Sequence, residues 1–242
     1  MKLGIISDAH GNCLALERCL GALRRLRVDT VYFLGDAVGY LPGENEVLDL
    51  LRSSEIFCQK GNHEGMLLGE IPLSPEKDLV YGISQARGRI SRENLDFIRQ
   101  WPDRRVLLSE GINILLVHGS PDNILEGYVY PDSDLSFTGH GPYDVIFMGN
   151  THYPFVSRRQ DKLVVNAGSC GLPRDQGDLA AFAVYDCRKR QAEIFRLRFD
   201  SDKVVKGFGS NSISAEVIDC LNRSSGAHFG KIIEEDSEEW AK

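Results

Sequence analysis

The segment KLGIISDAHGN, residues 2–12, decides the fold class, because a short apolar run in it ends at acidic, imidazole and glycine residues. The run at 2–7 has the length of a β-strand, and a helical stretch follows from Asn12 to Arg27. In that stretch leucines recur at helical spacing, with charged residues between them. We therefore expect an amphipathic helix that covers one face of the sheet containing the first strand.

Strands and helices continue to alternate along the first 60 residues. Strand-like runs at 30–34 and 56–60 enclose a helical stretch at 44–53. This β-α-β-α-β order is typical of a parallel sheet covered by helices.

The rest of the chain predicts helices first and antiparallel strands later. Residues 66–105 contain no strand-like run, and we expect two helices there, the second capped by Ser91 and ending before Pro102. Further strands are expected at 113–117, 144–148, 155–157, 163–165, 180–185 and 192–199, the last four as two hairpins. One short helix near 213–221 and a frayed acidic end complete the chain.

These elements predict an α/β fold in which two mixed β-sheets pack face to face and are flanked by helices, a four-layer αββα sandwich. Residues 1–205 are expected to form the main domain, and residues 206–242 a C-terminal helix and acidic tail.

Composition narrows the location and the partners. The first apolar run is too short for a signal peptide or a membrane helix, and the six cysteines are scattered without a CxxC pair, so we expect a cytoplasmic protein with reduced thiols and no membrane partner. A formal net charge of -7 disfavours long nucleic acid, which is bound mainly through Lys and Arg. Six arginines between 87 and 105 are interspersed with acidic residues, which favours a solvated helical face.

Five apolar runs each end in potential metal ligands. They are 3–7 before Asp8 and His10, 31–35 before Asp36, 56–61 before Asn62 and His63, 114–117 before His118, and 145–149 before Asn150 and His152. Since the carboxyl ends of strands form the ligand crevice of α/β sheets, we expect these side chains to meet at one rim. A single strand-end Asp is more often a helix cap or turn residue, but the five motifs in succession favour a metal site.

The residue types fit two divalent cations. Carboxylate, amide and imidazole groups bind Mn²⁺, which we expect first, and also Fe²⁺, Zn²⁺ or Ni²⁺. Two such ions about 3.5–4 Å apart hold a phosphate and lower the pKa of bound water towards about 7.

In these motifs the chain resembles the calcineurin-like metallophosphoesterases, especially their compact bacterial and archaeal phosphodiesterase branch. The resemblance covers roughly residues 1–200, and its carriers are DAHGN (8–12), GDAVGY (35–40), GNHE (61–64), HGSP (118–121), GNTH (149–152) and NAGSCGLPRD (166–175). It implies the αββα metallophosphoesterase fold. It also implies that Asp8, His10 and His152 bind one metal, that Asp36 bridges, that Asn62, His118 and the residue at position 150 bind the second, and that His63 is the general acid.

One position departs from the family pattern, in which GHxH is usual where this chain has Gly149-Asn150-Thr151-His152. The amide oxygen of Asn150 lies about where a histidine nitrogen would, but it should hold transition metals less well than imidazole. We therefore expect the second metal site to be the weaker one.

Substrate contacts are assigned to Asn12, Tyr40 and Arg174. An aromatic edge and a guanidinium suit a base and a phosphate, whereas packing of Tyr40 and pairing of Arg174 with Asp175 are the alternatives. The loop at 166–169 either presents backbone N–H groups to an anion or forms a plain tight turn. His140, in a turn-like setting, and His228 receive no role.

Three functions follow. The first is a metal-dependent phosphodiesterase or phosphoanhydride hydrolase that acts on a small nucleotide-like substrate by attack of metal-bound hydroxide. The second is a binding scaffold that keeps the fold with weakened or lost catalysis, as in the retromer scaffold subunit of this superfamily. The third is a nuclease on DNA or RNA, which would need a basic channel.

Overall fold

The computed structural model describes residues 1–136, 141–159, 161–209 and 212–234. Its strands are β1 (Lys2–Ile6), β2 (Thr30–Phe33), β3 (Phe57–Cys58), β4 (Arg104–Ser109), β5 (Ile112–Val117), β6 (Val145–Met148), β7 (Phe155–Arg159), β8 (Lys162–Asn166), β9 (Leu179–Asp186), β10 (Gln191–Arg198) and β11 (Lys231–Ile232). Its helices are α1 (Cys13–Arg25), α2 (Glu44–Ser53), α3 (Asn62–Leu68), α4 (Pro75–Tyr81), α5 (Ile83–Arg89), α6 (Arg92–Ile98), α7 (Ser201–Phe208) and α8 (Ala215–Leu221).

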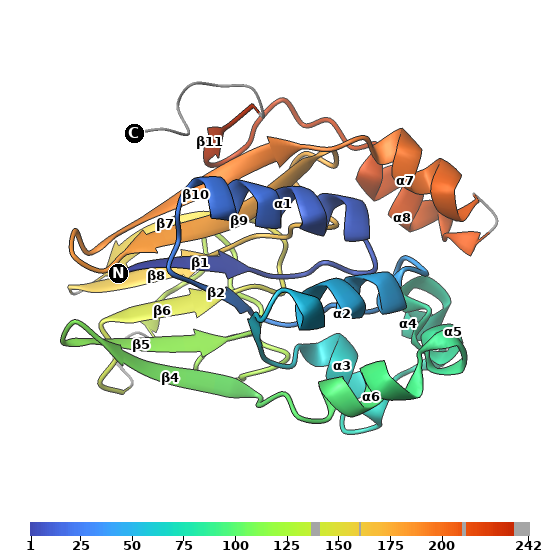
Figure 1. The fold of residues 1–242 in the computed structure, drawn as a ribbon, viewed down its shortest axis with the longest axis horizontal. Coiled ribbons are helices and arrows are strands. Elements are labelled where there is room, and N and C mark those ends of the chain that lie inside the picture. The colour runs from blue at the N-terminus through green and yellow to red at the C-terminus, as the bar shows by residue number, and fades with distance from the viewer. Residues whose placement is uncertain (137–140, 160, 210–211, 235–242) are drawn as a thin grey trace.

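The strands form two mixed sheets, which confirms the predicted fold class. One sheet has the order β11-β10-β9-β1-β2-β3, and the other has the order β4-β5-β6-β8-β7. In the first sheet β1, β2 and β3 are parallel, as the β-α-β-α-β order predicted, and β9 and β10 form an antiparallel hairpin. Figure 1 shows α1 and α2 lying along the strands of this sheet, on its outer side.

Successive side chains of a strand point to opposite faces, and because both faces of each sheet are covered, central strands such as β1 and β6 are buried almost throughout. Leu3 and Ile5 of β1 belong to the same buried cluster as Ile114 and Phe147 of the second sheet, so this cluster fills the space between the sheets. Ile6 belongs instead to the cluster shared with the helices. The three layers of apolar contact hold the strand ends of both sheets at fixed positions.

The outward face of the second sheet is covered by the segment that follows β5. Val129 and Leu135 of this segment are buried with Leu115, Ile146 and Val164 of the sheet. The described residues of this segment have little regular structure, yet their apolar side chains hold them to the sheet.

The expectation of two helices in residues 66–105 was wrong. Gly82 has a left-handed backbone (φ 65°), which ends α4 and starts α5, so three short helices form where two were predicted. The second predicted helix is confirmed as α6, with the side chain of Ser91 accepting a hydrogen bond from the N–H of Asn94. The prediction also missed β4, an edge strand whose residues alternate between exposed and partly buried.

The C-terminal region contains more structure than predicted. The expected helix is α8, but α7 spans residue 205, and β11 pairs in parallel with β10. The division at residue 205 stays a prediction. The expectations for His140 and for the acidic end from 235 onward fall outside the described residues. Among the helices that the structure describes, none has the length and hydropathy of a transmembrane segment.

A core prediction follows from the packing between the sheets. The ring of Phe147 is fully buried and meets Tyr185 edge to face, with ring centroids 5.6 Å apart. Phe147→Ala should lower the free energy of unfolding by about 3–5 kcal/mol, because it leaves a cavity between the sheets. Urea unfolding measures this change. Leu108→Ala, at a side chain 75% exposed on β4, is the control and should change stability by under about 0.5 kcal/mol. Equal effects of the two substitutions would contradict the packing.

Candidate metal centre

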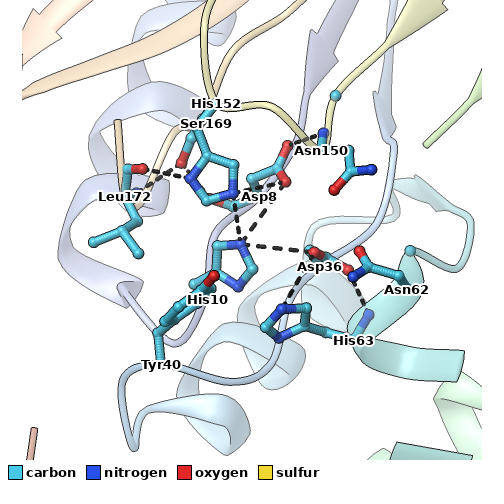
Figure 2. Close-up of polar contacts among 12 residues, drawn as sticks. Asp8, His10, Asp36, Tyr40, Asn62, His63, Asn150, His152, Ser169 and Leu172 are labelled. Carbon is cyan, nitrogen blue, oxygen red and sulfur yellow. Dashed lines mark hydrogen bonds and ion pairs between the residues drawn. The ribbon is translucent and has the colours of Figure 1, made fainter. Parts of the chain in front are cut away.

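The predicted ligands lie at strand ends of both sheets. Asp8 and His10 follow β1, Asp36 follows β2, and Asn62 and His63 begin α3 after β3. From the second sheet, His118 follows β5, and Asn150 and His152 follow β6. All eight side chains are at least 95% buried, and Figure 2 shows those it labels turned toward a common space. The centre therefore lies across the ends of two sheets.

Three of these residues form a compact group. Asp8, His10 and His152 offer ligand atoms that all lie within 4.8 Å of one another. The Nε2 atoms of His10 and His152 are 3.1 Å apart, and Oδ1 of Asp8 lies 3.3 Å from Nε2 of His152. The group has the membership expected for the first metal site.

Asp36 lies between this group and a second one. Its Oδ2 is 3.7 Å from Nε2 of His10 and 3.3 Å from Nε2 of His118. On the far side, Nε2 of His118 is 3.0 Å from Oδ1 of Asn62. A carboxylate in this position can contact cations in both halves, as a bridging ligand must.

Asn150 is oriented by two hydrogen bonds. Its backbone N–H donates to Oδ2 of Asp8 at 3.2 Å, and its side-chain Nδ2 donates to the carbonyl of Gly127 at 2.9 Å. With Nδ2 committed to Gly127, the amide oxygen is the end that can face a cation, and Figure 2 shows it turned back toward the Asp8 side. Asn150 therefore connects the centre to the loop that contains Gly127.

The ring orientations of three histidines fit a bound cation. Nδ1 of His10, His118 and His152 lies 3.1, 3.1 and 2.6 Å from the carbonyl oxygens of Val38, Leu34 and Leu172, respectively. A carbonyl only accepts, so each Nδ1 donates and Nε2 is the nitrogen that faces inward, with a free lone pair wherever the ring is neutral. Two such lone pairs face each other at 3.1 Å in His10 and His152, an arrangement that needs positive charge between them.

Buried atoms without hydrogen-bond partners lead to the same conclusion. Oδ1 of Asp8 and Nδ1 of His63 are buried, and neither has a partner among the described residues. An ionised carboxylate oxygen without a donor is costly in a protein interior unless a cation compensates it. The donor set of oxygen and imidazole nitrogen suits a divalent transition metal.

The protonation states also suit a cation. Burial lowers the pKa of His63 to about 3 and that of His152 to about 4, so both rings are neutral at pH 7. Burial opposes protonation of His118 as well, yet Asp36 and Asp8 raise its pKa to about 9. Burial alone would raise the pKa of Asp8 and Asp36, but the surrounding imidazoles hold both well below the usual range. The proton on His118 marks where two carboxylates attract positive charge, and a cation competes for that place.

The backbone at the centre is strained. Asp8, His10, Asp36, Asn150 and His152 all have positive φ angles, between 47° and 64°. Residues other than glycine rarely adopt this backbone conformation. It costs free energy and persists only where the surrounding structure enforces it. Five predicted ligands share it because each strand must turn sharply to direct its side chain into the crevice.

Glu64 holds the Asp36 turn in place. Its carboxylate accepts hydrogen bonds from the backbone N–H groups of Asp36, Ala37 and Gly61 at 2.7 to 2.8 Å. Burial, followed by repulsion from Asp36, raises the pKa of Glu64 to about 7, while the backbone donors favour its ionised form. Gly61 must lack a side chain because a Cβ there would lie 2.2 Å from Oδ1 of Asp36.

His63 packs against two aromatic rings beside the centre, and these two rings also contact each other. Tyr40 stacks on it with centroids 5.0 Å apart, and Tyr81 lies on it at 4.5 Å. Arg174 donates to the hydroxyl of Tyr40 at 3.1 Å. Of the predicted substrate residues, Tyr40 is thus adjacent to His63, and Arg174 is adjacent to Tyr40.

The alternative reading, in which Arg174 pairs with Asp175, does not hold, because Asp175 pairs through both its oxygens with the buried Arg196. Among the described residues, no ion pair joins Arg174 to a carboxylate, so its charge is available to the centre. Asn12 differs: its amide oxygen caps α1 at Ala15 and its nitrogen donates to Gly171. Its contact with substrate stays a prediction.

The loop at 166–169 is better described as a tight turn. The N–H of Ala167 donates to the carbonyl of Met148, and the N–H of Gly168 donates to Oδ1 of Asn166. The hydroxyl of Ser169 donates to the carbonyl of Asp8 at 2.7 Å. The loop supports the Asp8 turn, and these N–H groups have no capacity left for an anion.

Sequence reasoning assigned no role to Glu64, Tyr81, Tyr128 or Tyr130. Glu64 follows Gly61 by three residues at a helix start, and this capping-box spacing was the signal for its role. Tyr81 lies 18 residues from His63 on a separate helix, and no local pattern connects the two.

The fold and the site together define a metal-site protein of the αββα phosphoesterase class. The chain belongs to the calcineurin-like phosphoesterase superfamily, whose domain model matches residues 1–190. The resemblance drawn from the motifs is thereby confirmed.

Individual relatives agree with this membership. A protein of Methanocaldococcus jannaschii described as uncharacterized is 28% identical over 87% of this chain and 93% of its own. A phosphodiesterase of the same organism is 25% identical over 70% of this chain and 84% of its own. The crystal structure of a hypothetical protein from Pyrococcus horikoshii OT3 superposes with a TM-score of 0.81 at 20% identity, covering 95% of this chain and 99% of that one, and shows the shared fold.

Replacement of Glu64 tests its support of the Asp36 turn. Glu64→Gln places an amide group against backbone N–H donors, so we expect a loss of about 1–3 kcal/mol in the free energy of unfolding. Manganese affinity, measured by titration calorimetry, should fall about 10-fold or more because the Asp36 turn is less well held. Glu93→Gln, an exposed glutamate in the first turn of α6, is the control and should change neither quantity. Unchanged affinity in Glu64→Gln would show that the turn does not depend on this carboxylate.

Proposed function

We propose that the chain hydrolyses a phosphodiester or phosphoanhydride bond in a small nucleotide-like molecule, with two divalent ions as cofactors. The observation that carries the proposal is the convergence of the His10 and His152 Nε2 atoms on two ionised carboxylates, in a chain of this superfamily. Manganese is the ion we expect first.

Two overlapping ligand sets would hold the ions. Asp8, His10 and His152 would hold one with Asp36, and Asn62, His118 and Asn150 would hold the other with the same carboxylate. Bound ions of this kind lower the pKa of a water molecule and neutralise charge on phosphate oxygens. The chain itself supplies the fixed positions, because backbone carbonyls orient three of the imidazoles.

His63 is proposed as the general acid that protonates the leaving oxygen. Burial lowers its pKa to about 3, so the ring is neutral before substrate arrives. An anionic phosphate beside the ring would raise that pKa and allow His63 to carry a proton. The rings of Tyr40 and Tyr81 both pack against the imidazole and restrict its movement.

Arg174 is proposed to bind a non-bridging phosphate oxygen. Its half-buried guanidinium donates to the hydroxyl of Tyr40, which keeps it near the centre. Charge-assisted hydrogen bonds from arginine to phosphate are strong and directional.

The two alternatives have less support. A scaffold needs neither neutral imidazoles facing each other nor five ligands held with positive φ. A nuclease needs a basic channel, and the formal net charge of -7 disfavours long nucleic acid. We keep the cytoplasm as the expected compartment, with the six cysteines as free thiols.

Hydrolysis of bis(p-nitrophenyl) phosphate by manganese-loaded protein tests the activity. His63→Ala should lower kcat by about 100-fold or more, the scale of general acid catalysis, and should lower it further for a diester with an alkoxide leaving group. Metal content, measured by plasma mass spectrometry, should stay at two ions. His228→Ala, at an exposed histidine, should behave as the unaltered protein. If metal-loaded protein turns over no faster than His63→Ala, the proposal fails.

Substitution of Asn150 tests the weaker second site. We expect one ion to remain after dialysis and the second to be lost readily, because an amide oxygen binds transition metals less well than imidazole. Asn150→His should raise the affinity for the second ion by about 10-fold. Asn150→Ala removes the amide ligand and should weaken that site further. Equal affinity of the two ions in the unaltered protein would contradict this assignment.

A further inference from the structure

Two exposed tyrosines form a flat aromatic surface beside the metal centre. Tyr128 is 49% exposed and Tyr130 is 37% exposed, although both rings are large and apolar. They stack nearly parallel, with an interplanar angle of 12° and centroids 6.3 Å apart. Such a surface offers a flat face to a third ring.

The pair is held firmly rather than carried on a loose loop. Val129, between the two tyrosines, is 97% buried in the cluster that covers the second sheet. The preceding residues fold back on themselves, with the N–H of Gly127 donating to the carbonyl of Asn123 at 3.0 Å. A buried residue between two exposed ones places both rings on the same side of the segment.

Both ends of the pair are joined to residues of the centre. Asn150 donates its side-chain N–H to the carbonyl of Gly127, directly before Tyr128. Tyr130 packs against Tyr153, directly after His152, with centroids 6.0 Å apart. The residue that departs from the family pattern therefore also positions this aromatic surface.

The tyrosine pair lies near the groups proposed to bind phosphate. Burial raises the pKa of Tyr128 to about 12, and Tyr81 adds to the rise while Arg174 opposes it, so the three groups lie within electrostatic range. Tyr81 in turn lies on His63, and Arg174 on Tyr40. The tyrosine pair is therefore close both to the aromatic rings that pack on His63 and to the guanidinium of Arg174.

We infer that Tyr128 and Tyr130 determine substrate specificity by stacking on a planar aromatic group, such as a nucleobase, of the phosphate ester bound at the centre. The inference rests on the proposed function and adds the class of the substituent next to phosphate. Stacking of a base on an aromatic side chain depends on the π-face and not on donors, so it tolerates different bases. The phosphate is held by the centre and Arg174, and the ring by the tyrosine pair.

Binding to manganese-loaded protein, followed by titration calorimetry, tests the inference apart from catalysis. Adenosine 5′-monophosphate and ribose 5-phosphate carry the same phosphate and differ in the base. We expect the unaltered protein to bind adenosine 5′-monophosphate at least about fivefold more tightly than ribose 5-phosphate. This factor corresponds to the lower end of the free energies known for stacking one base on an aromatic side chain. In the double variant Tyr128→Ala, Tyr130→Ala this ratio should fall to about 1, with the affinity for ribose 5-phosphate unchanged.

Two control variants separate stacking from damage to the fold. Tyr128→Phe with Tyr130→Phe keeps both rings and should keep the ratio. Phe57→Ala removes a different aromatic ring, which is 50% exposed and stacks on Tyr32. This substitution should also leave the ratio of the two affinities unchanged. In turnover assays, the double alanine variant should raise KM for bis(p-nitrophenyl) phosphate more than for methyl p-nitrophenyl phosphate.

The outcomes distinguish this inference from the proposed function. A base preference that the double alanine variant abolishes, in a protein without turnover, supports the inference and overturns the proposed hydrolysis. If the protein turns over substrate but binds the two phosphates equally well, only the inference is overturned. The same holds if loss of both tyrosine rings leaves the ratio of the two affinities unchanged. A double variant that keeps the ratio but dissociates an oligomer, measured by sedimentation, also overturns it and makes the pair an interface between copies of the chain.

Discussion

Two imidazole nitrogens that face each other at 3.1 Å, each with its lone pair directed inward, are the constraint on which the centre depends. The carbonyls of Val38 and Leu172 fix the rings of His10 and His152 in this orientation. Neither nitrogen can satisfy the other, and the buried oxygen of Asp8 has no donor among the described residues. A cation between these atoms would bind the lone pairs of both nitrogens and the oxygen of Asp8. The donor set therefore suits a cation.

The rest of the fold supports this arrangement at some energetic cost. Ligand residues at the strand ends adopt left-handed backbone angles, which the packed sheets and the Glu64 hydrogen bonds enforce. The loop at 166–169 supports the Asp8 turn through Ser169. Strain and buried charge are therefore concentrated at the crevice, while the apolar cluster between the sheets supplies compensating stability.

Much of the fold followed from local patterns, and the failures have physical causes. The β-α-β-α-β order was visible because each of those strands lies in an apolar run of the sequence that is bounded by glycine or polar residues. The edge strand β4 was missed because its exposed positions weaken the apolar pattern, and β11 because a two-residue strand has no periodicity. The extra helix break came from Gly82, whose left-handed backbone ends α4 and begins α5.

The sequence alone determined which residues follow the strands, and hence the family and the identity of the expected ligands, because strand ends and ligand types are local properties. Only the tertiary structure decided how they meet: Asp36 lies between two groups of ligands, and Asp175 pairs with Arg196 and leaves Arg174 beside Tyr40. It also joined Asn150 to Gly127 and so brought Tyr128 and Tyr130 to the centre. These contacts join residues far apart in the chain, and their geometry depends on the packing of the two sheets.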